Sequence, residues 1–372
     1  LMINVNPGGT GARLNMAGSI AQEPGSSLGV IYMGDARYEL TGTDVNTYTG
    51  PTVVWHRGVG RNATTEPNLI LNRNTPNAAV PGDLVIGNRS TGGIGNVMVH
   101  LAQSDQIADT GVIRFDAGTG AFATGNGGNN SYFKLLGFNE TVAGIEDFTS
   151  SGVIENMEGE SQTTASTLTL QTLAGQTSFF NGFIRDRANN TGSGTLNLII
   201  SGSGTQVLSG GNISFSGSTT INSGATLVLE RTTAYGNGVG GAAATQLGDR
   251  SITNNGTLQL QIENGGTWTF NRAVTGTGGL TRFGNGTLNL SAAMTEEEGL
   301  ADLLESNACS LLELNVGNNY GLDRERIMQA LAKGAHHIRS FLAPSCLLND
   351  EHMAPGFDKL LLGKLTKLDV AN

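Results

Sequence analysis

Three aspartates in one stretch of the chain are the residues best suited to acid–base chemistry. Asp105 and Asp109 lie in the segment 103–110, and Asp116 follows shortly after it. Two carboxyl groups can cleave a glycosidic bond when one donates a proton and the other acts as base or nucleophile. Their spacing does not distinguish a cleft from solvated loops, and the one lysine of this region, Lys134, is isolated in sequence. We therefore predict no catalytic residues and keep a polysaccharide-active enzyme as an alternative.

Motifs for cofactors and metals are incomplete. The segment 236–241 matches G-x-G-x-x-G, but a dinucleotide site needs a βαβ unit around it, and β-type sequence follows. His336 and His337 are adjacent, so they cannot both face one site from a helix. The segment 125–130 lacks the aspartates of calcium-binding nonapeptides. We expect no cofactor and no metal ion.

The amino-acid composition indicates that the candidate residues above lie on β-strands and turns. Of 372 residues, 55 are glycine and 8 are proline, and only 14% are charged. Thr, Val, Ile and Leu fill the space between the glycines, which predicts an all-β chain with many turns. The net charge of −10 would repel nucleic-acid phosphates, so we expect no nucleic-acid partner. No apolar run long enough to span a membrane and no signal peptide occur, so we expect no membrane-spanning helix and favour an internal fragment.

A short strand pattern recurs between residues 166 and 290. The blocks are 166–170, 194–198, 225–229, 256–260 and 286–290, and their threonines lie at the nearly evenly spaced positions 167, 195, 226, 257 and 287. Leucines two positions apart share one face of a strand, so each block predicts a half-buried strand. The near-constant spacing predicts a solenoid in which the same strand of each coil stacks into one ladder of leucines. Weaker strands are predicted between the blocks, at 205–208, 213–215 and 219–221.

These blocks resemble the autotransporter-associated β-strand repeat family of bacterial surface and secreted proteins. The resemblance rests on Gly278-Gly279-Leu280-Thr281-Arg282-Phe283-Gly284-Asn285-Gly286-Thr287-Leu288-Asn289-Leu290-Ser291, with further similarity at 46–54 and 79–87, and it covers about residues 10–294. It implies a right-handed parallel β-helix. It implies no activity, because this repeat is a scaffold carried by proteins of many functions.

The character of the sequence changes near residue 294. Lysine is rare before this point and frequent after it, and both cysteines, Cys309 and Cys346, follow it. From residue 295 the pattern L-x-x-L-x-L-x-x-N recurs at a constant step, centred on Leu314, Phe341 and Leu368. This segment resembles leucine-rich repeat proteins of the helix-containing subtype similar to ribonuclease inhibitor. The predicted domains are therefore a β-helix at 1–294 and about three leucine-rich repeats, an α/β solenoid, at 295–372.

The leucine-rich segment offers the only binding surface that we predict. Outward positions of its strands would form a concave face of the kind on which such repeats bind proteins. These positions are Glu313, Asn315, Arg339, Ser340, Lys367 and Asp369. The two cysteines occupy unlike repeat positions, so we expect free, buried thiols, which suggests an intracellular origin for this segment.

Taken together, these features predict a non-enzymatic structural or adhesive solenoid, secreted or on the bacterial cell surface, with surface glycans or proteins as partners. The alternatives are an extracellular polysaccharide-active β-helix enzyme and a protein-binding module of leucine-rich repeats. The differing lysine and cysteine usage of the two segments leads to the hypothesis that their junction is a recent or artificial fusion.

Overall fold

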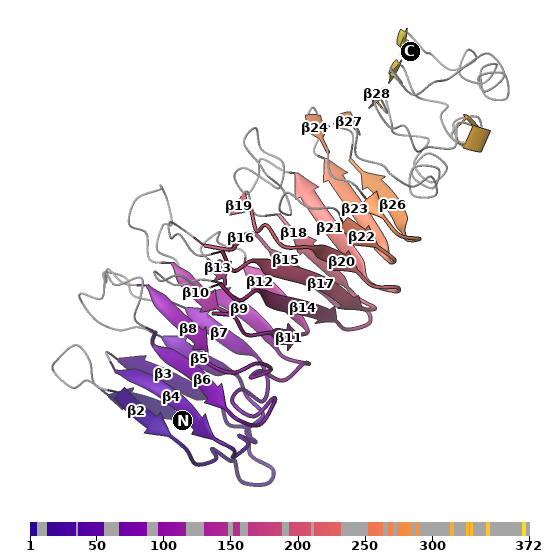
Figure 1. Cartoon of the computed structure of the whole chain (residues 1–372). Coiled ribbons are helices and arrows are strands. Elements are labelled where there is room, and N and C mark those ends of the chain that lie inside the picture. Colours follow the sequence, from indigo (N-terminus) through magenta and orange to yellow (C-terminus); the bar gives the residue numbers. More distant parts are fainter. Residues whose placement is uncertain are drawn as a thin grey trace. The chain divides into compact units, whose positions relative to one another are not determined.

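In the computed structural model, nearly all of the regular secondary structure among the described residues is parallel β-strand (Figure 1). The structure describes residues 1–5, 13–34, 36–55, 67–87, 96–116, 130–147, 152–156, 163–187, 193–209, 212–231, 252–262, 267–270, 274–284, 287–289, 313–315, 325–326, 328–329, 340–342 and 367–369. The chain divides into two compact units, one of residues 1–206 and 212–217 and the other of residues 207–211 and 218–372. The predicted parallel β-solenoid architecture is confirmed at this level.

The first unit contains three parallel sheets. Sheet A is formed, in order, by β1 (Met2–Val5), β3 (Val30–Gly34), β5 (Thr52–Trp55), β7 (Leu84–Gly87), β9 (Val112–Asp116), β12 (Gly144–Asp147) and β15 (Thr177–Phe180). Sheet B is formed by β2 (Arg13–Met16), β4 (Arg37–Gly42), β6 (Leu69–Arg73), β8 (Val97–Leu101), β10 (Ser131–Lys134), β13 (Gly152–Glu155), β16 (Phe183–Arg185) and β19 (Asn212–Ile213). Sheet C is formed by β11 (Glu140–Val142), β14 (Ser166–Thr172) and β17 (Leu196–Gly202).

Successive strands of the chain enter different sheets and return to the same sheet one coil later. Leu84 of β7 pairs with Ile113 of β9, whereas Ser131 of β10 pairs with Gly152 of β13 after a clearly shorter stretch of chain. Coil length therefore varies from turn to turn. What stays constant is the parallel register, which places one row of side chains from each coil directly above the row before it.

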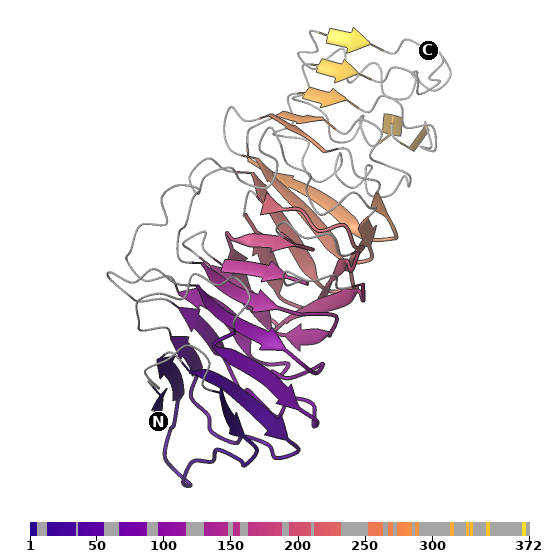
Figure 2. The same ribbon diagram turned by 60° about the vertical axis from the view of Figure 1, so that its left-hand side comes forward.

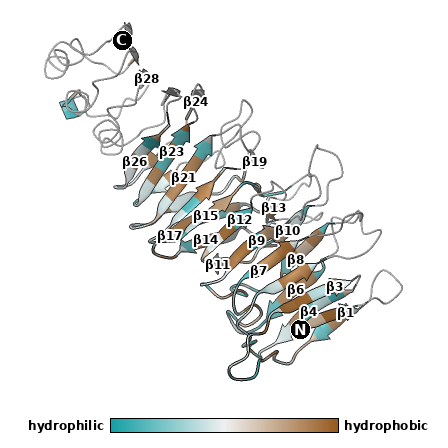
Figure 3. Ribbon diagram, turned by 180° about the vertical axis from the view of Figure 1, so that it is seen from behind, coloured by the Kyte–Doolittle hydropathy of each residue, from teal (hydrophilic) through white to brown (hydrophobic). Residues whose placement is uncertain are grey.

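Alternation along the strands creates the core. In β14 and β17 every second residue is buried, and the inward rows contain Leu168, Leu170, Leu198 and Ile200, all 0% exposed. The alternation is visible as bands of contrasting colour along many strands (Figure 3). Burial of one leucine side chain contributes about 1.5–3 kcal/mol, so this continuous interior is the main source of stability.

Gly202 shows why glycine is needed where a coil passes close to its neighbour. This residue ends β17 with φ of +80°, and a Cβ built on it would lie 2.2 Å from the carbonyl oxygen of Thr172 in the adjacent strand. The same carbonyl accepts hydrogen bonds from the backbone amides of Ser203 and Gly204. The neighbour is therefore backbone that cannot move aside without breaking the coil contact.

Replacing Gly202 with Ala should lower the free energy of unfolding by about 3 kcal/mol, since it adds a clash to an unfavourable φ. Gly25 is the matched control, because it has φ of +82° but no atom within 4 Å of the position that a Cβ would take. Gly25→Ala should cost about 1 kcal/mol, the strain of φ alone. Chemical denaturation of both variants measures the difference, and equal losses would contradict the close approach at Gly202.

The second unit continues the same construction. One ladder is formed by β20 (Thr219–Ile221), β22 (Ile252–Asn254) and β25 (Val274–Thr275), and another by β21 (Thr226–Arg231), β23 (Thr257–Ile262) and β26 (Gly279–Phe283). A third is formed by β24 (Thr267–Thr269), β27 (Thr287–Asn289), β28 (Glu313–Asn315), β29 (Ser340–Leu342) and β30 (Lys367–Asp369). The strand β18 (Thr205–Leu208) lies at the division between the units. The weaker strands predicted at 205–208 and 219–221 are β18 and β20, and β19 covers part of the one predicted at 213–215.

The prediction of a single leucine ladder is wrong. The blocks of Leu168 and Leu198 pair with each other as β14 and β17, whereas the blocks of Leu227 and Leu258 pair as β21 and β23 in a different sheet. Leu227 does pair with Leu258, as expected, but Leu258 then pairs with Leu280 rather than with Leu288. Leu288 lies in a different ladder, opposite Trp268. The reason is coil length. The coil that leads from β23 to β26 is shorter than the repeat of the sequence pattern, so the usual step from Leu258 overshoots this coil and ends in another sheet.

The ladder from β24 to β30 crosses the predicted boundary at 294/295. Leu288 of β27 pairs with Leu314 of β28, and the register then continues in equal steps to Phe341 and to Leu368 (Figure 2). The spacing read from the sequence therefore matches the strand register. The domain boundary itself and the assignment of 295–372 to leucine-rich repeats stay predictions.

Candidate functional site

The structure brings two of the three predicted aspartates together. Asp105 and Asp109 lie in the turn between β8 and β9, and both side chains are half-buried. Burial raises the pKa of Asp105, and the negative charge of Asp109 raises it further. Asp116 ends β9, where its backbone pairs with Gly87, and its side chain lies outside the described part of the structure. Two of the three predicted aspartates therefore form a pair at this corner.

Glu140 is a third acid at the same corner that sequence reasoning missed. It begins β11, is only 1% exposed, and accepts hydrogen bonds from the backbone amides of Gln106 (2.9 Å) and Ile107 (3.2 Å). Burial, and to a smaller extent the charge of Asp105, raises the pKa of Glu140 to about 8 despite these hydrogen bonds. Its alternation with inward-facing Val142 was the available signal, because residues two apart share a strand face.

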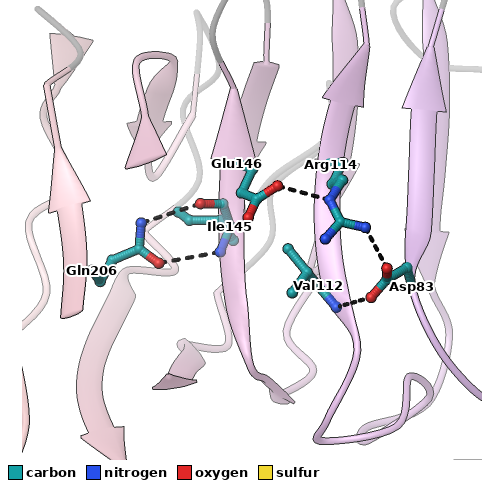
Figure 4. A network of polar contacts seen from close by, with 6 residues as sticks. All are labelled: Asp83, Val112, Arg114, Ile145, Glu146 and Gln206. Carbon is teal, nitrogen blue, oxygen red and sulfur yellow. Dashed lines mark hydrogen bonds and ion pairs between the residues drawn. The ribbon is translucent and has the colours of Figure 1, made fainter. Parts of the chain in front are cut away.

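A second polar cluster lies on the outer face of sheet A and connects three coils (Figure 4). The Arg114 Nε donates to Glu146 Oε2 at 2.7 Å, and its Nη1 forms an ion pair with Asp83. The other oxygen of Asp83 accepts the backbone amide of Val112 at 2.9 Å. Burial lowers the pKa of Arg114, but its hydrogen bonds to Glu146 and Asp83 outweigh this and raise it above the ordinary value. Arg114 thus remains a cation held between carboxylates of the coils before and after it.

Figure 4 also shows the buried side-chain amide of Gln206, which hydrogen-bonds to the backbone of earlier coils. Gln206 is 0% exposed, accepts from the backbone amide of Ile145 at 3.2 Å and donates to its carbonyl oxygen at 3.1 Å (Figure 4). Its Nε2 also donates to the carbonyl of Ser178 at 3.1 Å. One side chain thereby satisfies backbone groups that lie one and two coils earlier in the sequence.

The third cluster is a row of ionisable side chains on sheet B. His100, Lys134, Glu155 and Arg185 occupy one register position of β8, β10, β13 and β16. The Glu155 carboxylate accepts from Lys134 Nζ at 2.9 Å and from Arg185 Nε at 2.8 Å. Lys134 and Glu155 are almost fully buried, with 2% and 3% of their side chains exposed. Such a pair depends on mutual contact, because a buried charge without compensation is strongly unfavourable.

The surroundings of this row are both apolar and positively charged. Met98, Tyr132 and Val153 form a small buried cluster on the neighbouring row of the same sheet, with Phe183 packed against it. Lys134 Nζ lies 4.9 Å from the Tyr132 ring centroid. Burial, followed by the charges of Lys134 and Arg37, lowers the pKa of His100 to about 3. His100 is therefore a neutral imidazole at neutral pH.

The chemistry available to these clusters differs. Arg114 in the sheet A cluster and Glu155 in the sheet B cluster each bond side chains of the coil before and the coil after. The polar atoms of these clusters therefore link coils together. Glu140 likewise bonds a neighbouring coil through both carboxyl oxygens and is 1% exposed, although burial raises its pKa to about 8. The half-buried pair of Asp105 and Asp109 beside it is the feature of the described residues that best fits acid–base chemistry.

The predicted protein-binding positions of the leucine-rich segment share strand register. Glu313, Ser340 and Lys367 form one row of β28, β29 and β30, and Asn315 and Asp369 form another with Leu342 between them. Leu342 was missed, because its place in the row follows only from strand pairing. Arg339 lies outside the described residues. The role of these positions in binding stays a prediction.

Trp268, a large aromatic side chain of the second unit, packs in the interior: it is 1% exposed and its ring centroid lies 5.9 Å from that of Phe270. The segment 236–241, His336 with His337, and both cysteines lie outside the described residues. Within the described part of the chain, His, Cys, Asp and Glu side chains nowhere gather in threes as metal ligands would. The same part contains no helix that is long and apolar enough to cross a membrane.

Comparison with known proteins gives no match: no family model, no curated protein and no solved structure is similar to the chain.

Proposed function

We propose that residues 1–294 are a non-enzymatic structural or adhesive scaffold, a right-handed parallel β-helix of a secreted or surface protein. The observation that carries this proposal is that the buried and half-buried ion pairs join successive coils to one another. Arg114 joins Asp83 to Glu146, and Glu155 joins Lys134 to Arg185, each time across three consecutive coils. Charged groups used in this way stiffen a long stack of coils, as a scaffold requires.

The same proposal treats residues 295–372 as a fragment of leucine-rich repeats appended to this scaffold. Its support is the evenly stepped register from Glu313 to Ser340 to Lys367. A protein-binding role through these strands is the second alternative. Pull-downs with and without residues 295–372 address it: partners lost on deletion would favour a binding module, and unchanged partners would eliminate it.

A polysaccharide-active enzyme is the main competing function, and the half-buried pair of Asp105 and Asp109 in the turn between β8 and β9 favours it. The test incubates the chain with a panel of neutral and uronic-acid polysaccharides and measures new reducing ends and unsaturated uronates. We expect no turnover, and retention of the chain on insoluble polysaccharide would support adhesion. Turnover by the wild type that is lost in Asp105→Ala, with folding intact by circular dichroism, would overturn the scaffold proposal.

A further inference from the structure

The outer face of sheet C carries neither charged nor aromatic side chains. This face, which we call the sheet C face, consists of the outward residues of β11, β14 and β17: Thr141, Thr167, Thr169, Gln171, Asn197, Ile199 and Ser201. The other two sheets differ, since sheet A carries Arg114 with Glu146 and sheet B carries Lys134 with Glu155. In a chain with a net charge of −10, an uncharged face of this kind is a distinct chemical surface.

The parallel register arranges the side chains of the sheet C face in rows. Thr141, Thr169 and Ile199 form one row, and Thr167 and Asn197 form the row beside it. β14 and β17 are the longest strands that the structure describes, with seven residues each, and they pair at all seven positions. Neighbouring strands lie about 4.8 Å apart and alternate residues of one strand about 6.6 Å apart, so the rows form a regular grid.

The threonine hydroxyls of this grid are available to a ligand. The side chains of Thr141, Thr167 and Thr169 are half-buried, and among the described residues no hydrogen bond involves their hydroxyl groups. A hydroxyl group can both donate and accept a hydrogen bond. Because threonine is branched at Cβ, its side chain has few rotamers in a strand, so binding would cost little side-chain entropy.

The second unit has a threonine row in a ladder of its own. Thr220 of β20, Thr253 of β22 and Thr275 of β25 share one register position, and all three side chains are half-buried. The outward position of these short strands is again occupied by a side chain with a hydroxyl group. The row therefore recurs in the construction of the chain and is not a peculiarity of one coil.

The composition of the sheet C face narrows the kind of partner. Nucleic acids and acidic polysaccharides need lysine or arginine to offset their negative charge, and this face has neither. Protein interfaces are enriched in aromatic, methionine and arginine side chains, whereas Ile199 is the one large apolar residue among the seven. An uncharged ligand rich in hydroxyl groups fits best, because threonine, asparagine and glutamine can exchange hydrogen bonds with it.

We propose that the sheet C face binds the surface of an insoluble neutral polysaccharide, such as a β-linked glucan. The inference rests on the proposed adhesive scaffold and gives it a ligand class and a binding face. A single hydrogen bond on a water-exposed face contributes little, so affinity comes from many equivalent contacts along a repeating polymer. A solenoid suits this mode, since its hydroxyl rows repeat from coil to coil as the sugar units of the polymer repeat.

Binding of the full chain to microcrystalline cellulose, with calcium alginate beads as the acidic comparison, tests this proposal. We expect retention on cellulose that added sodium chloride does not weaken, because the face has no charge that salt could screen. The combined substitution Thr141→Val, Thr167→Val and Thr169→Val removes the hydroxyls but keeps the branched shape, and should weaken binding about tenfold or more. Thr177→Val, an exposed position at the start of β15 in sheet A, is the matched control and should bind like the wild type.

Thr169→Val alone is the milder variant if the triple variant does not fold by circular dichroism, and it should weaken binding about threefold. Cellulose binding that the triple variant keeps, or that Thr177→Val also loses, would overturn the assignment to the sheet C face and leave adhesion standing. Retention on alginate alone would overturn the neutral ligand class. Absence of retention on both would overturn the inference and leave the structural role of the scaffold unaffected. Self-association in analytical ultracentrifugation that the triple variant abolishes would assign the face to a second copy and overturn the proposal.

Discussion

Replacing Leu258 with Asp is expected to unfold the coil of the second unit that contains it. Leu258 is 0% exposed and lies between Leu227 and Leu280 in the ladder of β21, β23 and β26. The change removes about 1.5–3 kcal/mol of apolar burial and places an uncompensated carboxylate among leucines. The total loss should exceed about 4 kcal/mol, which thermal and denaturant unfolding followed by circular dichroism will measure.

Gln259→Asp is the matched control for this experiment. Gln259 is the next residue of β23 and alternates to the half-buried outer face, where it pairs with Val228 and Thr281. Introduction of the same aspartate should cost under about 0.5 kcal/mol there, as expected for a surface change. If the two variants lost equal stability, the inward and outward alternation on which the solenoid rests would be wrong.

Glu155→Gln is expected to have the second largest effect. The substitution keeps the shape of the side chain but removes the carboxylate that lies 2.9 Å from Lys134 Nζ and 2.8 Å from Arg185 Nε. Because the Lys134 side chain is only 2% exposed, its ammonium would remain buried beside a neutral amide. Breaking a buried ion pair in this way typically costs about 3–5 kcal/mol, and equilibrium denaturation at pH 7 measures the loss.

Glu146→Gln provides the comparison, since Arg114 keeps its contact with Asp83 in this variant. The side chains of Arg114 and Glu146 are 41% and 21% exposed, so water screens their pair. We expect a loss of about 0–1 kcal/mol. Adding Lys134→Met to Glu155→Gln should recover part of the stability, because it removes the buried cation. If Glu155→Gln lowered the free energy of unfolding as little as Glu146→Gln, the stability of sheet B would not depend on the buried pair of Lys134 and Glu155.

The local strand pattern was readable because inward-facing residues repeat at every second position. The blocks around Leu168, Leu198, Leu227 and Leu258 all became strands with buried leucines, and the constant step of the last segment predicted the register of Leu314, Phe341 and Leu368. The assignment of all these blocks to one ladder failed. Leu198 of β17 and Leu227 of β21 lie in different sheets, and Leu258 pairs with Leu280 instead of Leu288 because a shorter coil follows β23. Turn lengths, which the strand pattern does not contain, decide which strands meet.

The candidate site was only partly visible in the sequence. Asp105 and Asp109 were found because they are close together in the chain and both are acidic. Glu140 and the pair of Lys134 with Glu155 were not, since their partners lie a full coil away in the chain. Lys134 was even judged isolated, although the parallel register places Glu155 directly opposite it.

The sequence alone determined the fold class, the positions of many strands and which of their residues face inward, because alternation and glycine-bounded turns are local properties. Outside the evenly stepped pairings of Leu227 with Leu258 and of Leu314, Phe341 and Leu368, only the tertiary structure decided which strand lies beside which, where each coil closes, and which charges meet. The physical reason is that these contacts join residues one full coil apart. The length of the intervening turn sets that distance, and the conformation of the turn depends on the coils it must connect.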